Sequence, residues 1–158
     1  MGKDTVQNAN VIVRLSLSFF NHRMKQLTDC LPLESHKLVQ SQLAEYDNLS
    51  IRLVKPRKRI LGNYFQDGDS KHIITLNENL APYAMLLVLI HELAHLETRL
   101  KYGKKVSSHG KEWKQIYSSL LKNHIYENIF PKQWSEIVFL HAQKPCATFP
   151  KTLNFTRQ

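Results

Sequence analysis

The length, composition and charge of this chain limit the classes of protein to which it can belong. Its 158 residues suffice for one domain with a real core, and 42% hydrophobic with 22% charged residues is typical of a soluble globular protein. No apolar run is long enough to span a bilayer, and two distant cysteines, Cys30 and Cys146, do not make a disulfide framework.

The N-terminal sequence shows no secretory signal. Arg14 interrupts its apolar stretch, and no small-residue cleavage site follows. We therefore expect a cytoplasmic protein that does not associate with membranes.

Apolar residues at helical spacing predict two helices in the first third of the chain. The first runs from about residue 8 to 29, ends before Pro32, and has a stripe more typical of a core face than of a partner-binding face: Val13, Leu17, Phe20, Met24, Leu27 and Leu31. The second covers about residues 33–46, with Val39, Leu43 and Tyr46 facing inward.

Three strands are predicted to follow these helices. Ile51 and Leu53 alternate with Arg52 and Val54, as the residues of a half-buried strand do. Residues 59–66 and 71–76 read as two further strands, joined where an Asp-Gly pair signals a tight turn.

The second half of the chain is predicted to be mainly helical. Residues 81–101 form an apolar helix that Gly103 ends. Ser107 or Ser108 caps a helix of about residues 109–123, with an apolar stripe made of Trp113, Ile116, Tyr117, Leu120 and Leu121. Pro131 opens a last helix, and its inward side consists of Trp134, Ile137, Val138 and His141.

These elements predict an α+β domain over residues 1–142, with a small sheet of about three strands packed with helices. Residues 143–158 contain two prolines and no periodicity, so we expect an extended C-terminal tail.

The most informative feature is His91-Glu92-Leu93-Ala94-His95, an HExxH motif in the apolar helix. Positions i and i+4 lie on one face of an α-helix, so His91 and His95 can present ring nitrogens to one divalent ion. Glu92 lies about 100° round the helix, where it can reach a water on that ion without becoming a ligand. The alternative is a pair of core histidines that hydrogen-bond to backbone or carboxylate groups.

A catalytic zinc site usually has three protein ligands, and His109 is the best candidate for the third. It follows His95 across a glycine-bearing loop and falls in the first turn of a helix that packs back on the motif helix. The alternative is a surface-loop histidine. Zn²⁺ is the expected cofactor, although imidazoles also accept other late first-row ions.

At this point the chain resembles the SprT-like zinc metallopeptidases, which include bacterial SprT proteins and the eukaryotic Spartan protease. The likeness rests on HELAHL at residues 91–96 and HGKEWK at residues 109–114, and it extends to a strand pair in residues 59–77. It covers about residues 50–122. The resemblance implies a zincin-like fold in which His91, His95 and His109 bind zinc and Glu92 is the catalytic base.

The resemblance also implies proteolysis of DNA-associated proteins, including those crosslinked to DNA. With two cysteines, the chain lacks the cysteine-rich zinc ribbon that many bacterial members carry. It has no room for Spartan's tail with ubiquitin- and clamp-binding motifs. We therefore expect none of these recruitment modules.

Basic residues gather at two places, and the net charge of +9 favours a polyanionic partner. One cluster is Arg52, Lys55, Arg57, Lys58 and Arg59, and the second surrounds His109 with Lys101, Lys104, Lys105, Lys111 and Lys114. Both are candidate DNA contacts. Alternatively, the lysines merely keep the surface soluble.

Three other functions remain open on the sequence. The chain could be a zinc peptidase that cleaves free proteins or peptides without DNA, a non-catalytic nucleic-acid-binding module with structural zinc, or a zinc hydrolase of another kind. Glu92 favours catalysis, because a structural site needs no general base. The oxyanion donor is open among the lysines and Tyr83, Tyr102 and Tyr117.

Overall fold

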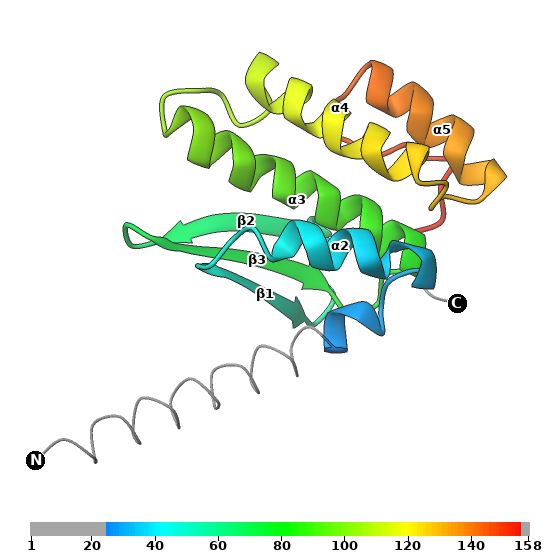
Figure 1. Ribbon diagram of the computed structural model, residues 1–158, viewed down its shortest axis with the longest axis horizontal. Coiled ribbons are helices and arrows are strands. Elements are labelled where there is room, and N and C mark those ends of the chain that lie inside the picture. Colours follow the sequence, from blue (N-terminus) through cyan, green and yellow to red (C-terminus); the bar gives the residue numbers. More distant parts are fainter. Residues whose placement is uncertain (1–24, 156–158) are drawn as a thin grey trace, which may run out of the picture.

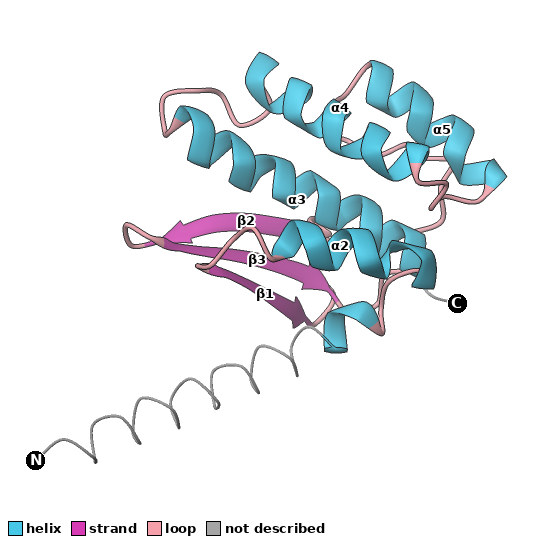
Figure 2. Ribbon diagram, in the orientation of Figure 1, coloured by secondary structure: helices cyan, strands magenta, loops and turns pink. Residues whose placement is uncertain are grey.

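The protein stacks its elements in three layers (Figure 1). The computed structural model describes residues 25–155. A three-stranded sheet forms the first layer, helix α3 (Pro82–Tyr102) lies across one face of it, and α4 (Lys111–Tyr126) and α5 (Lys132–Gln143) pack beyond α3. The predicted α+β architecture with a small sheet is therefore confirmed, and Figure 2 shows α3, α4 and α5 above the strands.

The sheet has the strand order β1-β3-β2, so β1 and β2 are its two edges. Strand β1 (Leu49–Val54) runs parallel to β3 (Lys71–Asn77), whereas β2 (Gly62–Asp67) runs antiparallel to β3. The turn between β2 and β3 contains Gly68 at φ 69°, a conformation that glycine adopts without strain.

Strand β2 begins three residues later than the predicted residue 59, because Asn77 holds the preceding segment as a loop. The Asn77 side-chain amide donates to the carbonyls of Ile60 at 2.9 Å and Arg57 at 3.3 Å. Its Oδ1 in turn accepts from Arg57 Nε at 2.8 Å. These bonds replace the strand pairing that the apolar pattern of the segment suggests.

The helices before the sheet agree in part with the sequence prediction. Of the first predicted helix, Val13, Leu17, Phe20 and Met24 lie outside the described residues, whereas residues 25–28 are helical and both Leu27 and Leu31 are buried. A short 3-10 turn (Leu33–Ser35) leads into α2 (His36–Leu43), which is shorter than the predicted 33–46. Val39 and Leu43 are buried as predicted, and Tyr46 packs against the core.

Helix α3 is the central element because both neighbouring layers contact it. It begins with Pro82 in its first turn and ends at Gly103, whose φ of 71° stops the helix and whose N–H donates to the Arg99 carbonyl at 2.9 Å. Residues 84–94 are all buried, in agreement with the apolar sequence of this helix.

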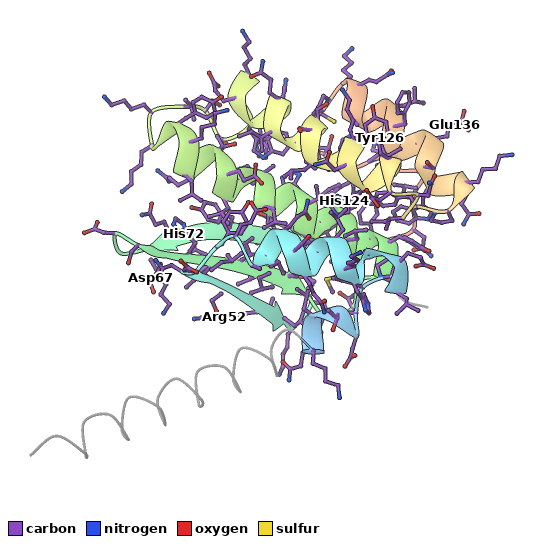
Figure 3. The ribbon with its side chains drawn as sticks, viewed as in Figure 1. Arg52, Asp67, His72, His124, Tyr126 and Glu136 are labelled. Carbon is purple, nitrogen blue, oxygen red and sulfur yellow. The ribbon has the colours of Figure 1, made fainter. Side chains whose placement is uncertain are left out.

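Helix α4 begins later than predicted. The prediction that Ser107 or Ser108 caps it and that His109 lies in its first turn is wrong, since Gly110 occupies the N-cap and no side chain caps the helix. Its predicted apolar stripe does face the core. Near its C-terminal end His124 is fully buried, whereas Tyr126 is 73% exposed (Figure 3).

Helix α5 starts directly after Pro131, as predicted, and buries Trp134, Val138 and His141. The following residues up to 155 form no helix or strand, yet they lie against the domain. Leu153 is buried, and the carbonyl of Phe155 accepts a hydrogen bond from the Ala81 N–H at 3.0 Å. None of the helices between residues 25 and 155 combines the length and hydrophobicity that a membrane span requires.

Candidate metal centre

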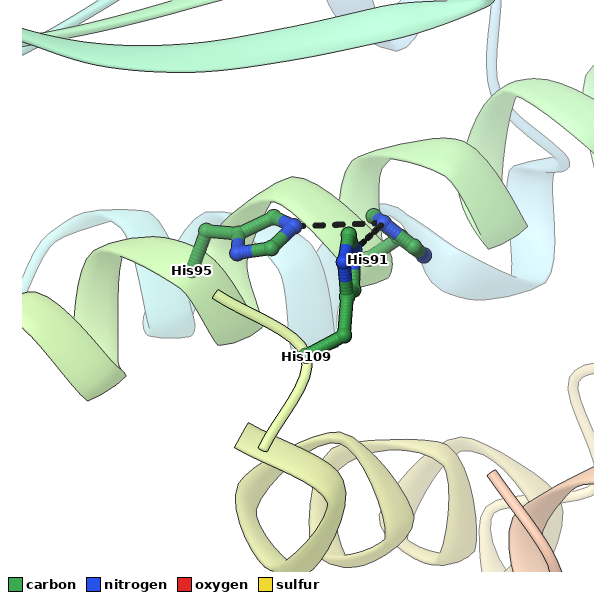
Figure 4. A group of neighbouring side chains, drawn as sticks. All are labelled: His91, His95 and His109. Atoms are coloured by element: carbon green, nitrogen blue, oxygen red, sulfur yellow. Dashed lines mark hydrogen bonds between the residues drawn. The ribbon is translucent and has the colours of Figure 1, made fainter. Parts of the chain in front are cut away.

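Three histidine rings from two different elements meet at one point (Figure 4). His91 and His95 lie one turn apart on the same face of α3, and His109 lies in the loop between α3 and α4. His91 Nε2 is 3.3 Å from His95 Nε2 and 3.3 Å from His109 Nε2. Among the described residues these three form a group whose ligand atoms all lie within 4.8 Å of one another.

These spacings fit a tetrahedral cation better than hydrogen bonds between the rings. Two nitrogens that each lie about 2.0–2.1 Å from a tetrahedral zinc are roughly 3.3 Å apart. A single lone pair on His91 Nε2 would have to accept from both neighbouring rings, whereas one cation would satisfy all three rings at once. The donor set of three imidazoles suits zinc and leaves a fourth position open.

The site keeps its imidazoles neutral, which is the form that binds a metal. Burial, and to a smaller extent charge repulsion from nearby His95, His109 and His141, lower the pKa of His91 to about 3. Burial likewise lowers the pKa of His95 to about 4 and moves the pKa of His109 below its ordinary value. The ring lone pairs are therefore available at neutral pH.

Trp113 supports all three rings, a role that sequence reasoning missed when it assigned this residue to the core. Its ring centroid is 4.6 Å from that of His109, 4.8 Å from that of His91 and 5.3 Å from that of His95. The side chain is fully buried. The sequence feature that could have indicated this role is the position of Trp113 four residues after His109, within the HGKEWK motif that carries the family resemblance.

Glu92 lies beside the histidines, under the first residues of β2. It is 6% exposed, and the backbone N–H of Tyr64 donates to its carboxylate. Burial raises the pKa of Glu92 to about 7, against the Tyr64 hydrogen bond and the charge of Arg57, which both lower it. A divalent cation held by the three histidines would favour the charged carboxylate.

Gly62 brings β2 close to this carboxylate. A Cβ at residue 62 would lie 2.8 Å from Glu92 Oε1 and 2.6 Å from Val88 Cγ1, so no larger residue fits without moving one of them. The sequence holds no local signal for this contact, because it depends on how β2 crosses α3.

The histidines and Glu92 lie in an open cleft of about 870 Å³. Its walls are α3, the segment from Arg59 through β2, the loop between α3 and α4, and residues 147–149 of the C-terminal segment. Phe149 reaches His91, with 5.1 Å between the ring centroids. No pattern in the sequence predicts this segment at the site, since the segment has no periodicity.

The three tyrosines named as oxyanion donors lie in different places. Tyr83 packs against Phe130 and Trp134, and Tyr102 lines a separate groove with Leu100. Tyr117 is close to His91, at 5.3 Å between ring centroids, but it is fully buried and does not line the cleft. None of the three is therefore presented to a substrate in this structure.

The predicted basic clusters divide between the cleft and the sheet. Arg59 and Lys104 line the cleft. Arg57 is instead bound to the sheet, since it donates to Asn77 Oδ1 at 2.8 Å and to Thr75 Oγ1 at 3.0 Å. Its guanidinium is less free to contact a phosphate than its exposed neighbours are.

Comparisons with known proteins bear on the family. Neither the curated proteins nor the solved structures give a match. The SprT-like family matches residues 18–131, a stretch that contains the whole sheet, α3, His109 and α4. This family is generally associated with metallopeptidase activity. Because the match covers well over half of the 158 residues, the chain belongs to the SprT-like family.

Proposed function

We propose that this protein is a zinc-dependent metallopeptidase with a zincin-like catalytic domain. The observation that carries the proposal is the convergence of three neutral imidazoles next to the buried Glu92 in an open cleft, with the nitrogens of His95 and His109 each 3.3 Å from His91 Nε2, as expected around a tetrahedral zinc. In this proposal His91, His95 and His109 hold the metal and Glu92 is the general base.

The chain's own residues divide the chemistry between them. A bound zinc ion activates water and polarises a carbonyl oxygen. Glu92 takes the proton from the water that attacks the peptide carbonyl and gives it to the leaving amine. The Tyr64 N–H and the close approach of Gly62 hold the Glu92 carboxylate in one place during this transfer.

The polypeptide substrate has a suitable docking edge in β2. Among the strands of residues 25–155, β2 pairs with β3 on one side only, and residues 62–66 line the cleft beside the histidines. An extended substrate chain can pair with the free side as an added strand, which would present its peptide carbonyl to the site.

The proposed substrates are proteins bound or crosslinked to DNA. The support is the net charge of +9 and the basic residues Arg59 and Lys104 at the cleft, with Arg52, Lys55, Lys58 and Lys105 exposed elsewhere. Family membership favours the same substrate class.

The test of the catalytic centre combines metal analysis with a cleavage assay. We expect one zinc per chain in the wild type and in Glu92→Gln, but cleavage lowered by about a thousandfold or more in Glu92→Gln, since the base is lost. His109→Ala should lose zinc as well as activity. Glu78→Gln, an exposed residue outside the cleft, is the matched control and should behave like the wild type.

The substrate class is tested by adding single-stranded or double-stranded DNA to the same assay. Stimulation by DNA supports the proposed class, and equal cleavage without DNA favours a peptidase of free proteins. Salt-dependent binding of nucleic acid with no proteolysis under any condition would favour a non-catalytic module. Turnover of a non-peptide substrate in an unbiased screen would indicate another kind of zinc hydrolase.

A further inference from the structure

Arg99 lies on the cleft face of α3, one turn beyond the second histidine of the motif. His91, His95 and Arg99 are spaced i, i+4 and i+8, so they share one face of the helix. Four residues advance the helix by about 6 Å, which separates Arg99 from His95 along the axis. Arg99 lines the same cleft as both histidines.

The Arg99 guanidinium has no counter-charge in the described part of the chain. Its Nη1 is buried and has no hydrogen-bond partner there, and the one ion pair found between residues 25 and 155 joins Lys71 to Asp67. The nearby carboxylate of Glu97 is directed to the Tyr46 hydroxyl, which donates to it at 2.8 Å. A half-buried charge without a counter-charge costs stability, so a ligand that supplies the missing negative charge would bind favourably.

Two side chains of the sheet, Tyr64 and His72, help to orient this guanidinium. Arg99 acts on the Tyr64 hydroxyl through its charge and through a hydrogen bond. Burial raises the pKa of Tyr64, whereas both of these interactions lower it. The same hydroxyl is 2.9 Å from His72 Nδ1, and the Tyr64 and His72 rings stack at 5.9 Å with 16° between their planes. Tyr64 on β2 and His72 on β3 thus both lie near Arg99, and neighbours of this kind favour one orientation of its guanidinium and reduce the entropic cost of binding.

The charges around the cleft favour an anionic ligand at this place. Arg59 and Lys104 join Arg99 in the lining, and the acidic residue in that lining is Glu92, which the first residues of β2 cover. Arg99 lines the cleft, and the nitrogens of its guanidinium that reach the cleft can donate charge-assisted hydrogen bonds to a carboxylate.

We propose that Arg99 is a specificity-determining residue that binds the side-chain carboxylate of an aspartate or glutamate in the polypeptide substrate. This inference rests on the proposed peptidase function and names the substrate feature that the site selects. An extended chain advances about 3.3 Å per residue, so the acidic residue lies about two or three positions from the bond that is cleaved.

The test compares peptides that differ only in having Glu, Gln, Ala or Lys at one of these positions. We expect wild-type kcat/KM to be at least about 10-fold higher for Glu than for Gln, the size of a charge-assisted hydrogen bond. Arg99→Gln should remove the preference, Arg99→Lys should keep part of it, and Arg99→Glu should favour the Lys peptide. A reversed preference cannot come from misfolding. Lys132→Gln, an exposed basic residue on α5 outside the cleft, is the control and should keep the wild-type preference.

Binding measurements separate this inference from the proposed function. Fluorescence anisotropy with zinc-loaded Glu92→Gln should give at least about 10-fold tighter binding of the Glu peptide than of the Gln peptide, lost when Arg99→Gln is added. Selective binding without wild-type cleavage would support Arg99 and refute the peptidase. Cleavage without selectivity would refute Arg99 and leave the peptidase standing.

Two further results would overturn the role of Arg99. If the preference followed a free C-terminal carboxylate and vanished for amidated peptides, the group recognised would be the chain end and not a side chain. If Arg99→Gln weakened binding of single-stranded DNA and left peptide selectivity unchanged, Arg99 would belong to a nucleic-acid contact. Absence of both peptide binding and cleavage in the zinc-loaded protein would refute both proposals.

Discussion

Gly62 leaves no room for a larger side chain near the proposed base Glu92, because β2 begins directly over Glu92 and Val88. We expect Gly62→Ala to lower kcat/KM by about 10-fold or more, because the new methyl group displaces the Glu92 carboxylate. Crowding against Val88 should lower the free energy of unfolding by about 1–3 kcal/mol. Peptide cleavage and urea denaturation measure the two effects.

Two controls identify crowding as the cause in the Gly62 variant. Zinc content should equal that of the wild type, because the three atoms nearest to a Cβ at this position belong to Val88 and Glu92 and not to the histidines. In a double-mutant cycle, Val88→Ala should relieve part of the loss of stability, since it removes the atom 2.6 Å from the new Cβ. If Gly62→Ala cleaved peptides at the wild-type rate, the close approach of β2 would not be what holds the Glu92 carboxylate in place.

Single residues were predictable where local geometry alone decides their position. The pairing of His91 with His95 follows from helix spacing, so the HExxH motif was sufficient to predict it. Arg57 was assigned to a phosphate-binding cluster, but it hydrogen-bonds to Thr75 and Asn77 of β3. Neither that contact nor the approach of Gly62 to Glu92 could be predicted, because each joins segments that only tertiary packing brings together.

At the scale of elements, the C-terminal segment is the part whose position has consequences for the site. Phe149 covers His91, and its ring centroid is 5.2 Å from that of Phe155. The Phe155 ring in turn contacts Trp134 of α5, with 6.3 Å between the ring centroids. The segment is thus anchored on the core and brings one aromatic ring to the three clustered histidines. We infer that it shields the His91 side of the site from water.

We expect Phe149→Ala to speed the loss of zinc to a chelator several-fold, because water and chelator then reach His91 more easily. The free energy of unfolding should fall by about 1–2 kcal/mol, less than for a fully buried phenylalanine. Phe139→Ala on the outer side of α5, where the ring is 40% exposed, is the control and should change neither quantity appreciably. Equal zinc release from both variants would contradict shielding by Phe149.

The elements themselves were predictable in proportion to the strength of their periodicity. Helices α3 and α5 begin and end close to the predicted residues, because Pro82, Gly103 and Pro131 mark their boundaries chemically. The start of α4 was placed too early, since a serine near a helix start is a weaker marker than the capping geometry that the loop adopts at Gly110. The aperiodic residues 144–155 carried no signal for their path across the cleft.

At the scale of the whole molecule, the fold lowers the pKa of six histidines in residues 25–155. Burial is the largest cause of a lowered pKa for each histidine of this set: His72, His91, His95, His109, His124 and His141. In the unfolded chain the same rings take up a proton near pH 6.5. The folded protein should therefore lose stability in mild acid even before its carboxylates titrate.

His124 allows this acid sensitivity to be tested away from the metal centre. It is fully buried on α4, and its Nδ1 lies 2.9 Å from the Leu120 carbonyl. Because its folded pKa is lowered by burial, its contribution to stability is intact above about pH 6.5 and falls as the pH drops toward the folded value. His124→Phe keeps a ring of similar size and removes the proton-binding group.

We expect the unfolding free energy of metal-free wild type to decline from pH 7.5 to pH 5.5, and that of His124→Phe to decline less steeply. The difference in slope can reach about 1.4 kcal/mol per pH unit, the value for one proton taken up only by the unfolded chain. At pH 7.5 the variant should lose about 1 kcal/mol or less, the worth of the Leu120 hydrogen bond. Urea denaturation with a chelator present measures both slopes without interference from zinc. Equal slopes would mean that His124 is protonated in the folded protein, and the neutral buried ring inferred from its surroundings would be wrong.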